Sequence, residues 1–159
     1  MSKKKIVFFL FLIIFIAMCV FYALQMRDYK KIEIFDVSGI TDGTNQFLYD
    51  VDAPLDSDYI VVSGYCYQNF TKYQTILYKI LLKREDGTYF SIKTQPIERN
   101  DLVEEDEVLS FSKVGFYGRV SKGLDFSNHY YEVCYYIKLN RSEEYIIHTN
   151  HYMGTREDN

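Results

Sequence analysis

The sequence predicts an all-β domain, a small antiparallel sandwich or barrel, that follows one membrane-spanning helix. Segments rich in β-branched and aromatic residues recur along the chain between turn residues, about seven in all, which is typical of a small antiparallel β fold. A single long apolar run lies near the N-terminus, and no amphipathic helical pattern follows it. The chain contains no internal repeat or low-complexity tract.

The apolar run extends from Ile6 to Leu24 and contains no charged residue, proline or glycine. As an α-helix it would be about 28 Å long, close to the hydrocarbon thickness of a bilayer. A cleaved signal peptide is the alternative, because Lys3–Lys5 is basic, but such a peptide has a shorter apolar core and small residues at its cleavage point. Cys19 also permits a lipoprotein interpretation, although the residues before it make a poor lipobox. We therefore expect a retained signal-anchor in the lipid bilayer.

The basic N-terminus favours a cytoplasmic location for this end of the chain. We therefore expect a single-pass protein of the cytoplasmic membrane, with a cytoplasmic stub and transmembrane signal-anchor at residues 1–27 and one extracytoplasmic domain at residues 28–159. The second part has about 130 residues, which is enough for one hydrophobic core but not comfortably for two.

The expected extracytoplasmic domain is acidic. Four of the 18 basic residues precede Asp28 and all 22 acidic residues follow Arg27, which leaves 14 basic against 22 acidic residues and a formal charge of −8. This charge argues against nucleic acid and anionic lipid headgroups as partners.

The first strands of the domain are indicated by alternation and by β-branched residues. Ile32–Val37 alternates with period two, as a half-buried strand does. Phe47–Tyr49 is a candidate short edge strand, and Asp50–Asp58 is expected to be an acidic loop. Tyr59–Tyr67 is expected to be a central strand in which Gly64 marks a bulge or a close approach.

The second half of the domain begins with a hairpin. Thr75–Lys83 and Thr88–Thr94 flank an Asp-Gly pair, which requires a positive φ at Gly87. Pro96–Glu107 is polar and acidic and is expected to be a loop that crosses between sheets. The remaining strands are expected at Val108–Val120, with interruptions at Gly115 and Gly118, at Tyr130–Leu139 and at Tyr145–Thr149.

Two cysteines lie in the expected extracytoplasmic domain, Cys66 and Cys134, and could form a disulfide there. Alternation in the strand around Cys134 places this residue with Glu132 and Lys138 on one face and its neighbours on the other, so Cys134 is expected to point outward. Two unpaired thiols are the default expectation, and a disulfide is the alternative.

Five segments together resemble the Ig-like β-sandwich domains that accompany cell-surface polysaccharide and teichoic-acid glycosyltransferases of Gram-positive bacteria. They are Val62–Tyr67, the hairpin from Leu77 to Phe90, Arg99–Leu102, Val114–Phe116 and Tyr131–Val133.

In that family the first segment ends in Gly-Trp-Ala-Phe. This chain departs from the pattern with Tyr65 in place of the Trp and Cys66 in place of the Ala. The resemblance covers roughly residues 32–153 and implies an Ig-like antiparallel β-sandwich of about seven strands. It also implies an accessory role beside glycosylation machinery and a structural role for Arg99 and Asp101.

Several residues are candidates for ligand binding. Arg99 and Asp101 could bind a ligand instead of fixing the crossover between sheets. Tyrosine rings offer flat faces on which sugar rings stack, with hydroxyls for hydrogen bonds, although half-buried tyrosines are also ordinary strand residues. The tyrosines considered are Tyr65, Tyr67, Tyr73, Tyr117, Tyr130 and Tyr136.

Candidate catalytic and metal sites are each outweighed by a simpler interpretation. His148 and His151 have odd spacing on a strand, which directs them to opposite faces, and no third ligand is near in sequence. The loop carboxylates Asp50, Asp52, Asp56 and Asp58 lack the glycine and glutamate of an EF-hand. The cluster of Asp101 and Glu104–Glu107 is too local to span a sugar cleft, and Cys66 with His129 is only a chance nucleophile and base.

We therefore expect no enzyme activity, no cofactor and no metal. The expected function is that of a membrane-anchored accessory protein of cell-envelope polysaccharide or teichoic-acid glycosylation. It would act by contact with a membrane glycosyltransferase or a polysaccharide transporter. The alternative is a carbohydrate-binding module that holds cell-wall glycopolymer on exposed tyrosines.

Overall fold

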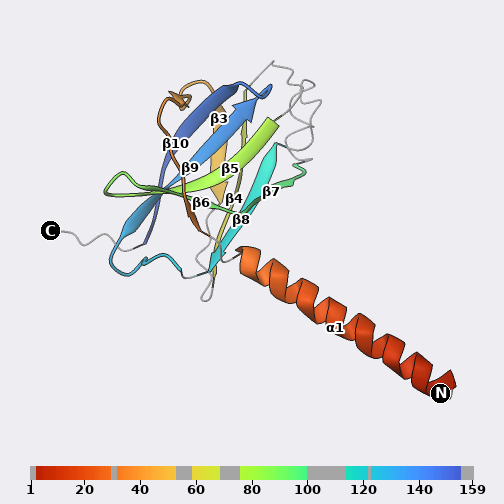
Figure 1. Ribbon diagram of the computed structural model, residues 1–159. Coiled ribbons are helices and arrows are strands. Elements are labelled where there is room, and N and C mark those ends of the chain that lie inside the picture. Colours follow the sequence, from red (N-terminus) through yellow and green to blue (C-terminus); the bar gives the residue numbers. More distant parts are fainter. Residues whose placement is uncertain are drawn as a thin grey trace.

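The computed structural model describes residues 3–29, 32–52, 59–68, 76–99, 114–121 and 123–154. In this part of the chain one helix, α1 (Lys3–Tyr29), precedes ten strands that form two sheets (Figure 1). The strands are β1 (Glu33–Ile34), β2 (Thr41–Asp42), β3 (Leu48–Asp52), β4 (Tyr59–Tyr67), β5 (Ile76–Arg84), β6 (Tyr89–Ile92), β7 (Thr94–Ile97), β8 (Gly115–Ser121), β9 (Tyr130–Leu139) and β10 (Glu143–Gly154). The prediction of a mostly β domain after one apolar helix is confirmed.

Helix α1 is apolar around its whole circumference. Every side chain from Val7 to Leu24 is exposed, and this stretch is long and apolar enough to cross a membrane. A helix that packs against a soluble core has an apolar stripe and an opposite polar face. The stretch Val7–Leu24 of α1 has no polar face, because it is apolar on all sides. Figure 1 shows α1 projecting away from the sheets, with its C-terminal end near β8.

The sheets differ in size. The six-stranded sheet has the order β1-β6-β5-β9-β10-β2, and the four-stranded sheet has the order β3-β4-β8-β7. All neighbours are antiparallel except β2 and β10, which are parallel. The predicted central strand is β4, which lies between β3 and β8. The predicted hairpin is β5–β6, and Gly87 has a φ of 85° at its tip.

The main core lies between the sheets. It takes alternate residues of β4, β5, β8 and β9, because successive side chains of a strand point to opposite faces. Two glycines allow the layers to approach each other closely. A Cβ atom at Gly64 would lie 2.6 Å from the Tyr135 hydroxyl oxygen, and one at Gly118 would lie 2.6 Å from Ile80 Cδ1. The buried residues of this core are Phe47, Val62, Cys66, Ile80, Leu82, Ile92, Phe116, Leu124, Tyr131, Val133, Tyr135, Ile137, Leu139, Ile147 and Met153.

A second, smaller cluster covers the outer face of the six-stranded sheet. Leu81, Cys134, Tyr136 and Ile146 are buried there beneath apolar side chains of the segment Phe35–Ile40 and of Tyr89. The sequence predicted one strand over Ile32–Val37, but only β1 is a strand. The rest of this segment lies over the sheet because Phe35 packs against Tyr136, with ring centroids 5.0 Å apart.

The chain passes from one sheet to the other at Lys93, between β6 and β7. The sequence placed this crossover in Pro96–Glu107 and expected a loop there, which is wrong for residues 96 and 97. Pro96 belongs to β7, which lies at the edge of the four-stranded sheet, and an edge strand tolerates the missing N–H of proline. Strand β8 begins at Gly115 and runs through Gly118 without interruption, and residues 108–113 of the predicted strand lie outside the described residues.

Candidate functional site

The candidate site is the outer face of the four-stranded sheet, which we call the tyrosine face and define by Tyr65, Tyr67, Tyr117 and Arg99. In β4 the even-numbered residues from Val62 to Cys66 are buried in the core, so the odd-numbered residues point outward. The register pairs Ser63 with Tyr117. Three of the predicted tyrosines therefore share one face, and all three are half-buried.

The rings at one end of the tyrosine face form a stack with an arginine. The Tyr65 and Tyr67 centroids are 5.9 Å apart, and the ring planes are inclined by 35°. The Arg99 guanidinium carbon lies 4.9 Å from the Tyr65 centroid, within the range of a cation–π contact. Arg99 lies two residues after the end of β7, so β4 and the segment after β7 contribute to this cluster.

A glycine in β8 makes room for Arg99. Gly115 lies opposite Tyr65 on one side and Ile97 on the other. A Cβ atom at Gly115 would lie 2.6 Å from Arg99 Cγ and 2.8 Å from Ile97 Cγ1. The absence of a side chain at this position therefore allows the arginine to cross β8 toward Tyr65.

Strand β3 adds carboxylates to the rim of the tyrosine face. Asp50 lies opposite Tyr65, Asp52 lies opposite Ser63, and both aspartates are exposed. The backbone carbonyl of Asp50 accepts a hydrogen bond of 3.0 Å from the buried Tyr135 hydroxyl, which ties β3 to the other sheet. Flat rings next to a guanidinium and carboxylates can stack on a sugar and hydrogen-bond its hydroxyls.

Other predicted site residues lie elsewhere. Asp101 and Tyr73 are outside the described residues. Tyr136 is buried in the cluster outside the six-stranded sheet, so its predicted place in a sugar platform is wrong. Tyr130 packs edge-on against Tyr152, away from the tyrosine face. Because β7 and β8 are neighbours in one sheet, Arg99 does not lie at the crossover between sheets.

The catalytic pairs considered from the sequence are also separated. Cys66 is completely buried in the core, and burial raises the pKa of its thiol. His129, directly before β9, instead contacts the Glu85 carboxylate in the turn between β5 and β6. Asp50 and Asp52 belong to β3, whereas Asp56, Asp58 and the cluster from Asp101 to Glu107 are outside the described residues.

The three cysteines are free thiols, and Cys66 and Cys134 lie on opposite sides of the six-stranded sheet. The predicted outward direction of Cys134 is correct. The side chain is nevertheless buried, because the segment Phe35–Ile40 and Tyr89 cover this face.

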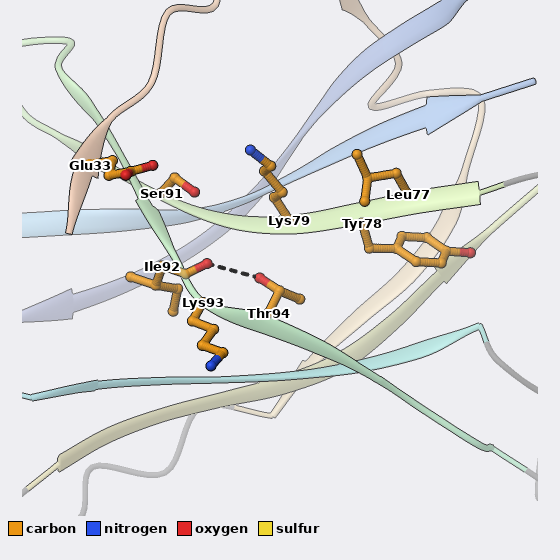
Figure 2. A pocket seen from close by; sticks show the side chains of 8 residues that line it. All are labelled: Glu33, Leu77, Tyr78, Lys79, Ser91, Ile92, Lys93 and Thr94. Carbon is orange, nitrogen blue, oxygen red and sulfur yellow. Dashed lines mark hydrogen bonds between the residues drawn. The ribbon is translucent and has the colours of Figure 1, made fainter. Parts of the chain in front are cut away.

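An open cavity of about 390 Å³ lies where β6 and β7 diverge from β5. The Thr94 hydroxyl bridges the divergence, since it accepts from the Ile80 N–H (2.8 Å) and donates to the Ile92 carbonyl (3.1 Å). Figure 2 shows Lys79 and Lys93 pointing away from each other. A ligand site needs polar groups that converge, so the cavity is a weaker candidate than the tyrosine face. It is lined by Glu33, Leu77, Tyr78, Lys79, Ser91, Ile92, Lys93 and Thr94.

One cluster of potential ligands was not anticipated from the sequence. Glu132, Cys134 and His148 offer a carboxylate, a thiol and an imidazole nitrogen within 4.8 Å of one another. The residues are up to 16 positions apart, and only the register of β9 and β10 brings them together. The alternation of the strand placed Glu132 and Cys134 on one face, which was a partial signal for this cluster. The sequence could not show that His148 lies opposite them.

Comparisons with known proteins do not assign the chain to a family. No family model matches the chain, and neither a curated protein nor a solved structure matches it.

Proposed function

We propose that this chain is a non-enzymatic, membrane-anchored accessory protein of cell-envelope polysaccharide or teichoic-acid glycosylation. It acts by contact with a membrane glycosyltransferase or polysaccharide transporter and presents the tyrosine face outside the cytoplasmic membrane. The observation that carries the proposal is the exposed apolar helix that ends close to the first strand. Only residues 30 and 31 separate α1 from the first described residue of the domain, Ile32, which keeps the domain near the bilayer where membrane enzymes and lipid-linked sugars lie.

We further propose that the domain is an Ig-like sandwich. In a variable-type Ig domain strands A, B, E and D form one sheet and strands C″, C′, C, F and G form the other. If β3 to β10 are assigned to A, B, C, C′, D, E, F and G in chain order, the strand orders β3-β4-β8-β7 and β6-β5-β9-β10 agree with this scheme without C″. Strands β1 and β2 are then additions at the edges of the larger sheet.

The partner is tested by affinity purification of the full-length chain from its native membranes in mild detergent. The expected result is recovery of a glycosyltransferase or a polysaccharide transporter. The variant with Tyr65, Tyr67 and Tyr117 all changed to Ala is expected to lose this protein. Tyr152→Ala is the matched control, because Tyr152 is exposed on β10, outside the tyrosine face. Recovery of neither class of protein, or equal recovery by the triple variant, would contradict the proposal.

A carbohydrate-binding module is the second candidate, and the stack of Tyr65, Tyr67 and Arg99 favours it. Aromatic rings stack on the apolar faces of sugars, so purified wall polysaccharide should bind the full-length chain in detergent micelles. The domain is acidic, and a neutral polysaccharide should therefore bind more tightly than a phosphate-bearing teichoic acid. Binding of neither polymer would contradict a carbohydrate-binding role and favour contact with a protein partner.

A further inference from the structure

The cluster of Glu132, Cys134 and His148 lies on the outer face of the six-stranded sheet, away from the tyrosine face. Glu132 and Cys134 are 5% and 0% exposed, and the His148 side chain is 25% exposed. We propose that these three residues bind a divalent transition-metal ion of the zinc class. This inference does not depend on the proposed function.

The fold holds the histidine in place through its backbone. His148 is paired with Cys134, and the register then shifts because Thr149 and Asn150 form a bulge in β10. The His148 N–H donates to the Thr44 hydroxyl (2.9 Å), and its carbonyl accepts from the Tyr49 hydroxyl (3.2 Å). Both hydrogen bonds come from outside the β9–β10 ladder and hold the His148 backbone, from which the imidazole contacts the Cys134 thiol.

The bulge also positions the carboxylate. Asn150 has a φ of 55°, and its N–H donates to Glu132 Oε1 at 3.3 Å. The Thr149 hydroxyl donates to the Val133 carbonyl at 2.5 Å and holds the bulge against β9. One carboxylate oxygen is thus oriented by a backbone N–H while the other is directed at His148, which is the usual arrangement around a metal ligand.

Two of the three ligand separations match a tetrahedral zinc site, and all three ligand atoms lie within 4.8 Å of one another. Usual zinc–sulfur, zinc–nitrogen and zinc–oxygen bond lengths place tetrahedral sulfur and nitrogen ligands about 3.5 Å apart, and nitrogen and oxygen ligands about 3.4 Å apart. Cys134 Sγ lies 3.5 Å from His148 Nδ1, and Nδ1 lies 3.2 Å from Glu132 Oε2. Three protein ligands leave a fourth position for water, which can enter beside the partly exposed imidazole.

The same geometry excludes a cysteine nucleophile activated by a histidine and an acid. In such a triad the imidazole contacts the nucleophile with one nitrogen and the acid with the other. Here the thiol and the carboxylate both approach Nδ1. Convergence on one point is instead what a metal ion requires.

Lys83 supplies a positive charge next to the Glu132 carboxylate, with which a metal ion would compete. Its ammonium lies 3.4 Å from Glu132 Oε2 and 5.9 Å from the centre of the Tyr89 ring. The Lys83 side chain is 34% exposed, so the ammonium can move into solvent. Metal binding would break the Lys83–Glu132 contact and release the Cys134 thiol proton to solvent as the sulfur–metal bond forms.

The test is a titration with Co²⁺ of the reduced full-length chain in detergent micelles, without a histidine tag. Co²⁺ reports on ligand type, because a thiolate ligand gives a charge-transfer absorption band and a tetrahedral site gives strong visible bands. The expected result is one Co²⁺ per chain with the thiolate band, displaced by Zn²⁺. Cys19→Ser is expected to keep the band and Cys134→Ala to lose it. Absence of the band in the wild-type protein would overturn the proposal, whatever the folding of the variants.

Matched histidine variants separate a metal site from a hydrogen-bonded structural cluster. His148→Gln is expected to weaken Co²⁺ affinity by about 100-fold or more, since even changes to groups around the ligands cost about 10- to 100-fold. His151→Gln, an exposed neighbour on the same strand, is expected to have no effect. Lys83→Met is expected to tighten binding, because the competing charge is removed. Equal loss in both histidine variants, or weaker binding by Lys83→Met, would contradict the proposal.

Discussion

The outer faces of the two sheets are built in the same way but differ in how much of each is buried. Both consist of the outward residues of alternating strands. The face of the six-stranded sheet is covered by the segment Phe35–Ile40 and by Tyr89, which bury Leu81, Cys134, Tyr136 and Ile146. The face of the four-stranded sheet has no such cover among the described residues, and its tyrosines remain half-exposed. A covering segment therefore converts one face into a second core.

The largest expected effect separates the two faces by stability. Leu81→Ala should lower the free energy of unfolding by about 3 kcal/mol, because it leaves a cavity in the covered cluster. Leu48→Ala is the matched change on the open face, where Leu48 is 47% exposed, and it should cost less than about 1 kcal/mol. Urea unfolding of the full-length chain in micelles measures both values. Equal losses would show that the two faces are not differently covered.

The next prediction concerns recognition by the open face. Tyr65→Ala should weaken binding of the partner or the polysaccharide by about tenfold, since an aromatic contact contributes on the order of 1 kcal/mol beyond the area it buries. The unfolding free energy should change little, because the ring is only half-buried. Tyr152→Ala, an exposed tyrosine on β10, should leave binding unchanged. The measurement is the equilibrium binding affinity of the two variants. Equal losses of affinity would mean that recognition does not depend on the tyrosine face.

A third prediction tests how Arg99 is held on the open face. Gly115→Ala should cost about 1 kcal/mol of stability, because the new Cβ would displace the Arg99 and Ile97 side chains. In the Arg99→Ala background the cost should become smaller, since Arg99 Cγ is then absent. The double-mutant cycle by urea unfolding isolates this coupling. A cost that is independent of Arg99 would mean that the arginine does not cross β8 as described.

The smallest effect is the acid sensitivity of the β5–β6 hairpin. Hydrogen bonds from Arg84 and Thr88 hold the pKa of Asp86 well below its usual range. The unfolded chain then binds more protons in acid, so this carboxylate contributes stability above about pH 4 that is lost as the pH falls further. Asp86→Asn should reduce the decrease in the urea midpoint between about pH 5 and pH 3. An unchanged decrease would mean that Asp86 has no part in it.

Local sequence patterns predicted the strands better than they predicted which segments pack against those strands. The β-branched and aromatic residues identified Tyr59–Tyr67 and alternation identified Tyr130–Leu139, with the bounds of β4 and β9, and Asp86-Gly87 identified the hairpin turn. Alternation also placed Cys134 on the outer face, but it could not show that a distant segment buries it. Solvent exposure depends on what packs from elsewhere in the chain, and a strand pattern contains no information about that.

The two candidate sites show the same limit. Tyr65 and Tyr67 share a face because they are two residues apart, so the sequence alone could pair them. The contribution of Arg99 depends on the register of β7, β8 and β4, which is set by the whole sheet. The cluster at His148 depends on a bulge in β10, and the sequence treated the histidines there as polar residues at a strand end. Bulges change the direction of single side chains, which a regular alternation cannot anticipate.

The most direct test of the account is the labelling of an engineered cysteine in intact cells with a membrane-impermeant maleimide. Asp52→Cys places a thiol on the exposed rim of the tyrosine face. The wild-type chain is the control, because Cys66 and Cys134 are buried and Cys19 lies in the apolar helix. The account predicts labelling of the variant without permeabilisation and little labelling of the wild type. Labelling only after the membrane is opened would contradict an extracytoplasmic domain, and labelling only after denaturation would contradict an open tyrosine face.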